Sequence, residues 1–248
     1  QPALAALGFV CRILPNPAQQ GGPFLYAERI ENAGLVTAFS YGHGDVVRGQ
    51  DAQWRTGLSP WRISVEGERW YGRGTADNKG QHTINLGALA AVLEARGRLG
   101  FNLKLLIETG EEVGSPGLRE VCEQQRELFR ADVFIASDGP RLSPGRPTIF
   151  LGSRGALNFD LSVELRKGGH HSGNWGGLLA NPGTLLAHAI ASITSPSGEI
   201  RVPEWRPDTL TEAVRKALAD CEVSGGPDAP EIDPHWGEPG LTAAEKVY

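Results

Sequence analysis

The chain has 248 residues and a formal net charge of −5, with 40% hydrophobic and 21% charged residues. This is the composition of a globular protein, and the negative charge argues against a general nucleic-acid-binding surface. No apolar stretch approaches the roughly 18 to 20 residues that span a bilayer, so we expect no membrane contact. Cys11, Cys122 and Cys221 are far apart and form no CxxC pair, which predicts a reducing, cytoplasmic location rather than a disulfide framework.

Apolar runs alternate with helical periods in the first part of the chain. Three runs predict strands over residues 34–41, 101–109 and 131–137. Between the first two, apolar residues recur at helical spacing over 83–97, and Gly97 is a stop signal. A further helix is predicted over 116–129. This alternation indicates an α/β fold with a mostly parallel sheet.

The pattern changes in the second part of the chain. In "ALNFDLSVELR" (156–166), apolar and polar residues alternate strictly, which is the period of a strand with one solvent-facing side. A helix is predicted to follow, because Asn181 can cap it and Pro182 fits its first turn. We therefore expect two domains, residues 1–153 and residues 154–248, of which the second is an α+β module.

One imidazole and five carboxylates occur near the ends of the predicted strands or in a glycine-rich turn before a helix. They are His43, Asp45, Asp77, Glu111, Glu112 and Asp138. In an open α/β sheet, the working site lies beyond the carboxyl ends of the strands. The sequence therefore predicts that these side chains converge at one edge of one sheet.

So many carboxylates would repel one another unless a divalent cation neutralised them. Imidazole with carboxylate suits Zn²⁺, with Mn²⁺ and Co²⁺ as alternatives. His43 is predicted to bind metal, and Asp45 to orient its imidazole. Two neighbouring metals would need a bridging carboxylate, for which Asp77 is the natural candidate. Of Glu111 and Glu112, one would bind metal and the other would take a proton from water.

Each of these signals has a simpler interpretation when it is taken alone. A lone HxD is usually loop chemistry, and "EE" before a helix is a favourable charge at the helix dipole. "GRGTADNKG" is similar to a phosphate loop but lacks the spacing and the Lys-Ser/Thr ending of a P-loop. Their joint placement at strand ends favours the metal site.

The motifs "YGHGDVV", "YGRGTADNKG", "ETGEEVGSPGL", "ASDGP" and "HHSGNWGG" resemble, in order and spacing, those of the di-zinc aminoacyl hydrolases. That family includes carnosinase, carboxypeptidase G, acetylornithine deacetylase and succinyl-diaminopimelate desuccinylase. The chain is most similar to the carnosinase-like dipeptidase branch, and the resemblance covers nearly its whole length. It implies a zinc-peptidase catalytic domain followed by a lid domain that also forms the dimer.

The resemblance implies a role for each matching residue. His43 and Asp138 would bind the first metal, Asp77 would bridge both metals, and Glu112 would bind the second. Glu111 would be the general base. The peptide bond between Asp77 and the next residue would be a non-proline cis bond.

The second module matches the lid, and His171 matches a lid histidine that stabilises the oxyanion in the partner subunit's site. A C-terminal histidine of the second metal site has no counterpart here. The chain also starts at Gln1, contains no methionine and ends in "LTAAEKVY", which resembles an unfinished helix. We therefore expect part of a longer protein, with a catalytic domain incomplete at its C-terminal part.

The expected function is hydrolysis of an amide bond in a dipeptide or aminoacyl amino acid, with two divalent ions as cofactors. The alternative within enzymes is an N-acyl amino acid deacylase that removes acetyl or succinyl groups. The alternative outside enzymes is an inactive homologue that only binds a partner. The expected partners are a small peptide or N-acyl amino acid substrate and a second copy of the chain.

Overall fold

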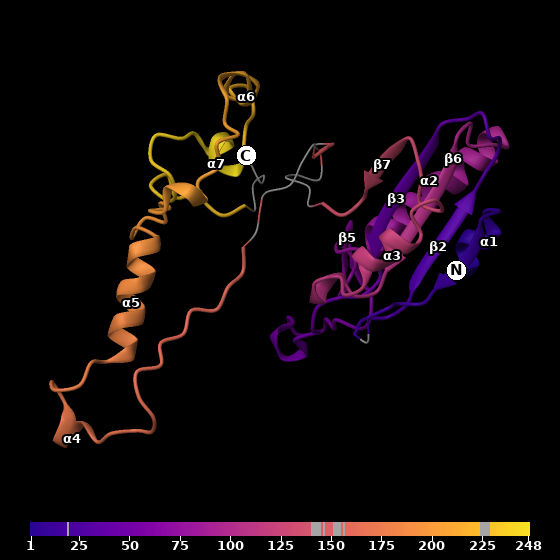
Figure 1. The fold of residues 1–248 in the computed structure, drawn as a ribbon. Coiled ribbons are helices and arrows are strands. Elements are labelled where there is room, and N and C mark those ends of the chain that lie inside the picture. Colours follow the sequence, from indigo (N-terminus) through magenta and orange to yellow (C-terminus); the bar gives the residue numbers. More distant parts are fainter. Residues whose placement is uncertain (19, 140–144, 146, 151–154, 156, 224–228) are drawn as a thin grey trace. The chain divides into compact units, whose positions relative to one another are not determined.

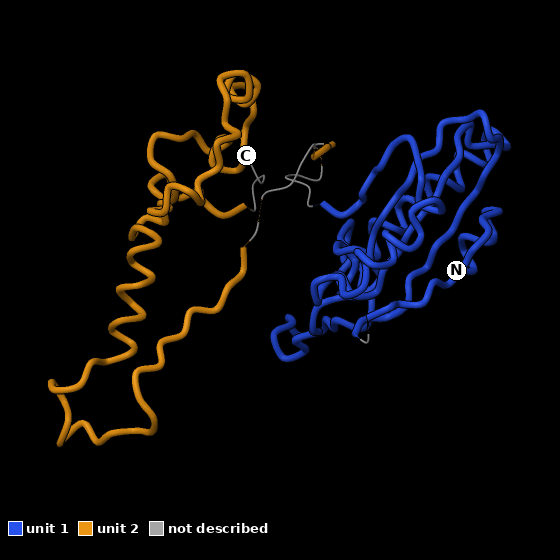
Figure 2. The backbone as a smooth tube through the Cα atoms, in the orientation of Figure 1, with its two compact units in different colours: residues 1–139 blue, residues 140–248 orange. Residues whose placement is uncertain are grey.

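The computed structural model describes residues 1–18, 20–139, 145, 147–150, 155, 157–223 and 229–248. The chain forms two compact units, Gln1–Gly139 and Pro140–Tyr248 (Figure 2). The predicted boundary between residues 153 and 154 falls outside the described residues and stays a prediction.

The first unit is built on one sheet (Figure 1). Its described strands lie in the order β1 (Val10–Leu14), β2 (Phe24–Arg29), β6 (Asn102–Glu108), β3 (Thr37–His43) and β7 (Val133–Ala136). Strand β2 runs antiparallel to both of its neighbours, whereas β3 pairs in parallel with β6 and β7. Of the described strands in this sheet, all but β2 therefore run in one direction, and the mostly parallel sheet predicted from the sequence is confirmed.

The register of the parallel strands aligns their carboxyl ends. His43 at the end of β3 pairs with Glu108 at the end of β6, and Tyr41 pairs with Ala136 at the end of β7. Asp138 lies two residues beyond Ala136, level with His43. The residues that follow all three strands therefore leave the sheet at the same edge.

Helices cover both faces of this sheet. Helix α2 (Lys79–Arg96) packs through Leu86, Leu89, Val92 and Leu93 on a core that includes Ala27 and Leu105. Helix α3 (Leu118–Gln124) contributes Val121 to a second core with Tyr26 and Leu106. Since neighbouring strand residues point to opposite faces, the two helices lie on opposite sides. Helix α1 (Pro2–Ala6) adds Leu4 to the first core.

The predicted helices form with shifted ends. Helix α2 begins four residues earlier than expected, and Gly97 ends it in the left-handed conformation at φ 68°. Helix α3 is shorter than the predicted 116–129. A hairpin of β4 (Ser64–Glu66) and β5 (Arg69–Tyr71) and the 3-10 turn η1 (Asp51–Gln53) lie between β3 and α2. None of these three short elements was predicted.

The second unit contains short helices and one longer one. In chain order its described elements are α4 (Ser172–Trp175), α5 (Pro182–Ile193), the 3-10 turn η3 (Pro203–Trp205), α6 (Glu212–Leu218) and α7 (Ala243–Val247). The start of α5 is as predicted, because the Asn181 side chain accepts a hydrogen bond from the Thr184 amide at 3.2 Å. No helix among the described residues is long and apolar enough to cross a membrane.

The strand predicted over 156–166 is wrong for its described residues. Residues 157–165 belong to no helix or strand, and Leu157 and Phe159 are 69% and 54% exposed. An alternating segment becomes a strand only where another strand completes its hydrogen-bond ladder. The described part of this unit offers only an isolated bridge between Thr194 and Ile200. The helical part of the predicted α+β module is therefore present, whereas its strand is not formed.

A buried asparagine fixes the loop that leads into β3. Asn102 is 2% exposed. Its Oδ1 accepts hydrogen bonds from the amides of Glu31 and Asn32 at 2.8 and 3.2 Å. Its Nδ2 donates to the carbonyls of Asn32 and Leu35 at 2.8 and 3.1 Å, and lies 3.3 Å from Thr37 Oγ1. One side chain thus satisfies several backbone groups at once.

Asn102→Ala is expected to lower the free energy of unfolding by about 3 kcal/mol, because it leaves buried donors and acceptors unpaired. Asn102→Asp directs a carboxylate oxygen at the carbonyls of Asn32 and Leu35, so it should lower the stability at least as much. Denaturant unfolding of both variants measures the difference. A loss below about 0.5 kcal/mol for the alanine variant, the range of an ordinary surface substitution, would contradict this role.

Candidate metal centre

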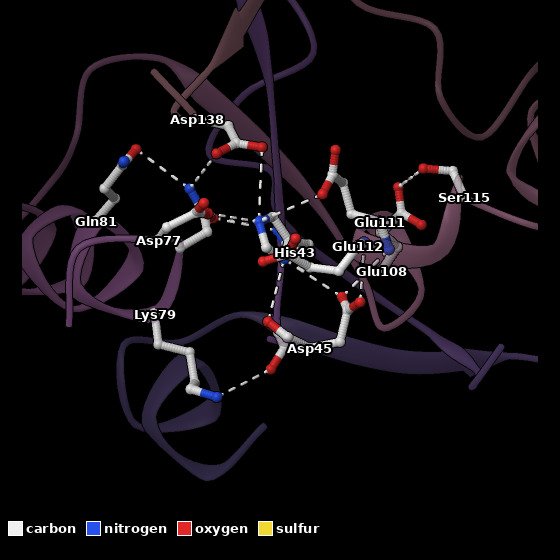
Figure 3. Close-up of polar contacts among 12 residues, drawn as sticks. His43, Asp45, Asp77, Lys79, Gln81, Glu108, Glu111, Glu112, Ser115 and Asp138 are labelled. Atoms are coloured by element: carbon white, nitrogen blue, oxygen red, sulfur yellow. Dashed lines mark hydrogen bonds and ion pairs between the residues drawn. The ribbon is translucent and has the colours of Figure 1, made fainter. Parts of the chain in front are cut away.

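The structure brings the predicted residues of the first unit together at the carboxyl edge of the sheet (Figure 3). His43 ends strand β3 and is 1% exposed. Its Nε2 lies 2.9 Å from Asp77 Oδ1, 3.7 Å from Asp138 Oδ2 and 3.9 Å from Glu111 Oε2. Three separate loops therefore direct carboxylates at one nitrogen of one imidazole.

Glu112 completes a group that could hold a metal ion. One donor atom each from His43, Asp77 and Glu112 lie within 4.8 Å of one another. Imidazole and carboxylate are the donors that Zn²⁺ and related divalent ions take. Asp138 faces the same imidazole nitrogen from the end of β7, so it can serve as a further ligand.

Asp45 holds both the imidazole and the loop that carries the two glutamates. His43 Nδ1 lies 3.3 Å from Asp45 Oδ1 and 3.2 Å from its backbone oxygen. The Asp45 carboxylate also accepts hydrogen bonds from the amides of Glu111 and Glu112 at 3.2 and 3.1 Å. The first contact suits the orienting role inferred from the sequence, whereas the two amide contacts were not predicted.

Asp45→Ala is expected to weaken metal binding by about 10- to 100-fold, the usual effect of removing a partner behind a ligand. Loss of the carboxylate frees both the His43 ring and the amides of Glu111 and Glu112. Competition titration with a chromogenic zinc chelator measures the change in affinity. The zinc affinity of Asp45→Asn should lie between those of the wild type and Asp45→Ala, because the single amide oxygen accepts fewer of these hydrogen bonds. Wild-type affinity in the alanine variant would contradict the role.

Asn78 ties the metal group to two strands. The peptide bond between Asp77 and Asn78 is cis, as predicted. The Asn78 side chain is fully buried and accepts a bond from the His43 amide at 3.2 Å. It donates to the Ser137 carbonyl at 2.7 Å and to Asp138 Oδ1 at 3.0 Å. Asn78 therefore sets the position of Asp138 relative to His43.

His82 supports the same strand end from helix α2. Its Nε2 lies 2.7 Å from the His43 carbonyl oxygen, to which it donates. Burial lowers the pKa of His82 and outweighs this backbone hydrogen bond, which favours the neutral ring. A Cβ on Gly42 would lie 2.1 Å from His82 Cε1 and 2.6 Å from Asn78 Oδ1. Glycine is therefore required beside His43.

The electrostatics of the cluster suit a cation. Burial lowers the pKa of His43, but the hydrogen bond with Asp77 and the nearby carboxylate charges outweigh it, so the pKa is raised. Burial also raises the pKa of Glu111, and the Asp138 and Glu112 carboxylates add to this effect, while His43 opposes it. Both pKa shifts reflect several carboxylates that lie close together in a partly buried site.

Arginines of the first unit pair with other carboxylates: Arg12 with Glu28, Arg29 with Glu31 and Arg55 with Glu66. The nearby ammonium group of Lys79 donates instead to the Gly44 carbonyl at 3.3 Å. With Nδ1 of His43 donating to Asp45, a neutral ring would direct the lone pair of Nε2 at the carboxylates. A divalent ion would relieve this repulsion, so the donor set fits a metal.

His171 lies in the second unit, where it is the N-cap of α4. Its Nδ1 accepts a hydrogen bond from the Gly173 amide at 3.1 Å, and the side chain is exposed. This hydrogen bond caps a short helix and is no test of a catalytic role for His171. The role of His171 at a partner's site stays a prediction.

Three comparisons place the chain among known proteins. The model of peptidase family M20/M25/M40 matches residues 39–243. A cysteinylglycine-S-conjugate dipeptidase of Corynebacterium striatum is 33% identical over 218 residues, which cover 83% of this chain and 47% of that protein. The chain therefore spans about half the length of this relative.

Two solved structures share the fold. Human carnosine dipeptidase 1 has a TM-score of 0.69 and 27% identity, over 90% of this chain and 49% of that one. An M20 family metallo-carboxypeptidase of Sulfolobus solfataricus has a TM-score of 0.73 and 28% identity, over 94% of this chain and 54% of that one. Both likenesses extend across the two units of the chain.

Proposed function

Since the chain belongs to peptidase family M20/M25/M40, we propose that it carries the catalytic centre of a metal-dependent hydrolase of dipeptides or aminoacyl amino acids. The observation that carries this proposal is the convergence of Asp77, Glu111, Glu112 and Asp138 around the buried His43. The names of the similar dipeptidases support a short peptide as the substrate.

Two divalent ions, with zinc as the first choice, are the proposed cofactors. His43 Nε2 and the Asp138 carboxylate would hold the first, Glu112 the second, and the two oxygens of Asp77 would serve both. Such ions, when bound, lower the pKa of water and polarise the carbonyl of the scissile amide. The further ligands that zinc requires would come from outside the described cluster.

Glu111 is the proposed general base. Its Oε2 lies 3.9 Å from His43 Nε2, and its side chain is 39% exposed, so it reaches both the metal group and incoming substrate. The carboxylate would take the proton of the attacking water and then deliver it to the leaving amine. Burial raises the pKa of Glu111, which brings it closer to the working pH of a proton carrier.

The second unit is proposed to supply the remaining functions. Residues 154–248 would form the lid and a homodimer contact, and His171 would donate a hydrogen bond to the oxyanion at the partner's site. A cytoplasmic location is proposed on the basis of the three unpaired cysteines. Size-exclusion chromatography with light scattering tests the dimer.

A substrate panel on the complete, zinc-loaded product of the gene tests the function. The panel contains dipeptides, N-acetyl amino acids and N-succinyl amino acids, and release of the free amine is measured. The proposal predicts that dipeptides have the highest kcat/KM, by a factor of at least about 10, or about 1.4 kcal/mol of transition-state binding. Preference for the acyl amino acids would establish a deacylase, and no turnover of any compound would establish an inactive homologue.

A further inference from the structure

Glu108 is a buried carboxylate that the proposed reaction does not use. It is 1% exposed and stands at the end of strand β6. Its neighbour two residues earlier, Leu106, packs in the core under helix α3 with Val121. Because alternate strand residues share a face, Glu108 points to the α3 side of the sheet.

One carboxylate oxygen of Glu108 joins two parts of the fold. Its Oε1 accepts hydrogen bonds from the hydroxyl of Tyr41 on strand β3 and from Ser115 Oγ, the latter at 2.9 Å. Its Oε2 is buried without a hydrogen-bond partner among the described residues. An unpaired buried carboxylate oxygen is unfavourable for folding, so such a group calls for an explanation.

Ser115 closes the segment that carries the two site glutamates, residues 110–115, which we call the glutamate turn. The turn contains the 3-10 helix η2 (Glu111–Val113), and the Ser115 amide donates to the Gly110 carbonyl at 2.8 Å. Ser115 has a φ of 52°, a left-handed conformation that a residue with a side chain adopts at a cost. Its hydroxyl contact with Glu108 helps to hold it there.

The glutamate turn is thus fixed at two places. Near the start of the turn, Asp45 accepts hydrogen bonds from the amides of Glu111 and Glu112. At the end of the turn, Glu108 accepts a hydrogen bond from the Ser115 hydroxyl. Asp45 follows strand β3, and Tyr41, which donates to Glu108, lies on strand β3. The glutamate turn is therefore connected at both of its ends to the strand that ends at His43.

We propose that Glu108 is a positioning residue, which holds the glutamate turn against strand β3 through the hydroxyls of Tyr41 and Ser115. The inference rests on the proposed function, because its catalytic consequence is the placement of Glu111. A base displaced by about 1 Å can lose on the order of 100-fold in rate. The packing of the turn itself does not depend on that function.

The test compares Glu108→Ala, Glu108→Gln and Ser115→Ala in the complete product of the gene, with Glu120→Ala on the exposed side of α3 as control. Glu108→Ala should lower kcat by about 10- to 100-fold with little change in KM. Glu108→Gln keeps an acceptor oxygen and should restore most of the rate. Ser115→Ala should reproduce part of the loss, and the control should match the wild type.

A second readout needs neither metal nor substrate. Amide hydrogen exchange, followed by mass spectrometry on the metal-free protein, should show faster exchange in peptides covering 110–115 in Glu108→Ala than in the wild type. If that variant does not fold, Ser115→Ala, which removes one hydroxyl, provides the comparison. Amide exchange of residues 110–115 at the wild-type rate in these variants would overturn the proposal.

Two kinetic results would also overturn it. One is an unchanged kcat in folded Glu108→Ala, and the other is a Glu108→Gln variant as impaired as Glu108→Ala. If the wild type hydrolyses no compound of the panel, the proposed function fails on its own. The exchange measurement then still decides whether Glu108 positions the turn.

Discussion

Glu111→Ala is expected to lower kcat by about 1,000-fold or more, within the range usual for loss of a general base, while the protein keeps its metal. Glu111 faces His43 Nε2 at 3.9 Å, but Glu112 rather than Glu111 completes the compact metal group. Removal of its carboxylate should therefore remove the proton carrier and leave the ligands. Steady-state kinetics and metal analysis of the same sample measure both effects.

Two further variants sharpen this experiment. Glu111→Gln preserves the size of the side chain but cannot take a proton, so it should be as inactive as Glu111→Ala. Glu94→Ala, on the exposed part of helix α2, removes a glutamate elsewhere and should be fully active. Turnover within tenfold of the wild type in Glu111→Gln would rule out the general-base role.

Asp77→Ala is expected to weaken metal binding strongly and to abolish turnover. Asp77 Oδ1 lies 2.9 Å from His43 Nε2, and the carboxylate is the proposed bridge between two ions. Because loss of a residue that only supports a ligand already costs 10- to 100-fold in metal affinity, we expect loss of the bridge to cost at least about 100-fold. Isothermal titration of the metal-free protein with zinc measures this loss.

The matched control for this experiment is Asp208→Ala, an exposed aspartate of the second unit. It should bind zinc as the wild type does. Circular dichroism should show that Asp77→Ala is folded, because the Asp77 side chain is 65% exposed and contributes little to the core. Wild-type zinc affinity in folded Asp77→Ala would exclude the bridging role.

The sequence predicted the strands that position the site, because each is a long apolar run followed by glycine and acidic residues. Strands β3, β6 and β7 were found for this reason. Strands β1 and β2 were missed, since they pair antiparallel with each other and no helix lies between them to indicate a strand-helix-strand repeat. The strand predicted over 156–166 failed for the opposite reason: its alternation is clear, but pairing depends on a partner that a local pattern does not reveal.

The same contrast holds within the site. His43, Glu111 and Asp138 were located by the rule that sites lie at the carboxyl ends of parallel strands, whereas Asp77 was found in a glycine-rich turn before a helix. Asn78 and Glu108 were not singled out, because their importance comes from burial and from hydrogen bonds to distant residues. A glutamate at a strand end looks the same in sequence whether it faces water or the core.

We propose that His43, Asp77 and Asp138 share a divalent metal ion. The most direct test of this proposal is anomalous X-ray diffraction at the zinc edge from crystals of the complete, zinc-loaded gene product. We expect an anomalous peak at about 2.0 to 2.1 Å from His43 Nε2 and about 2.0 to 2.2 Å from a carboxylate oxygen of the cluster. Zinc-loaded crystals with no anomalous peak among these three side chains would contradict it.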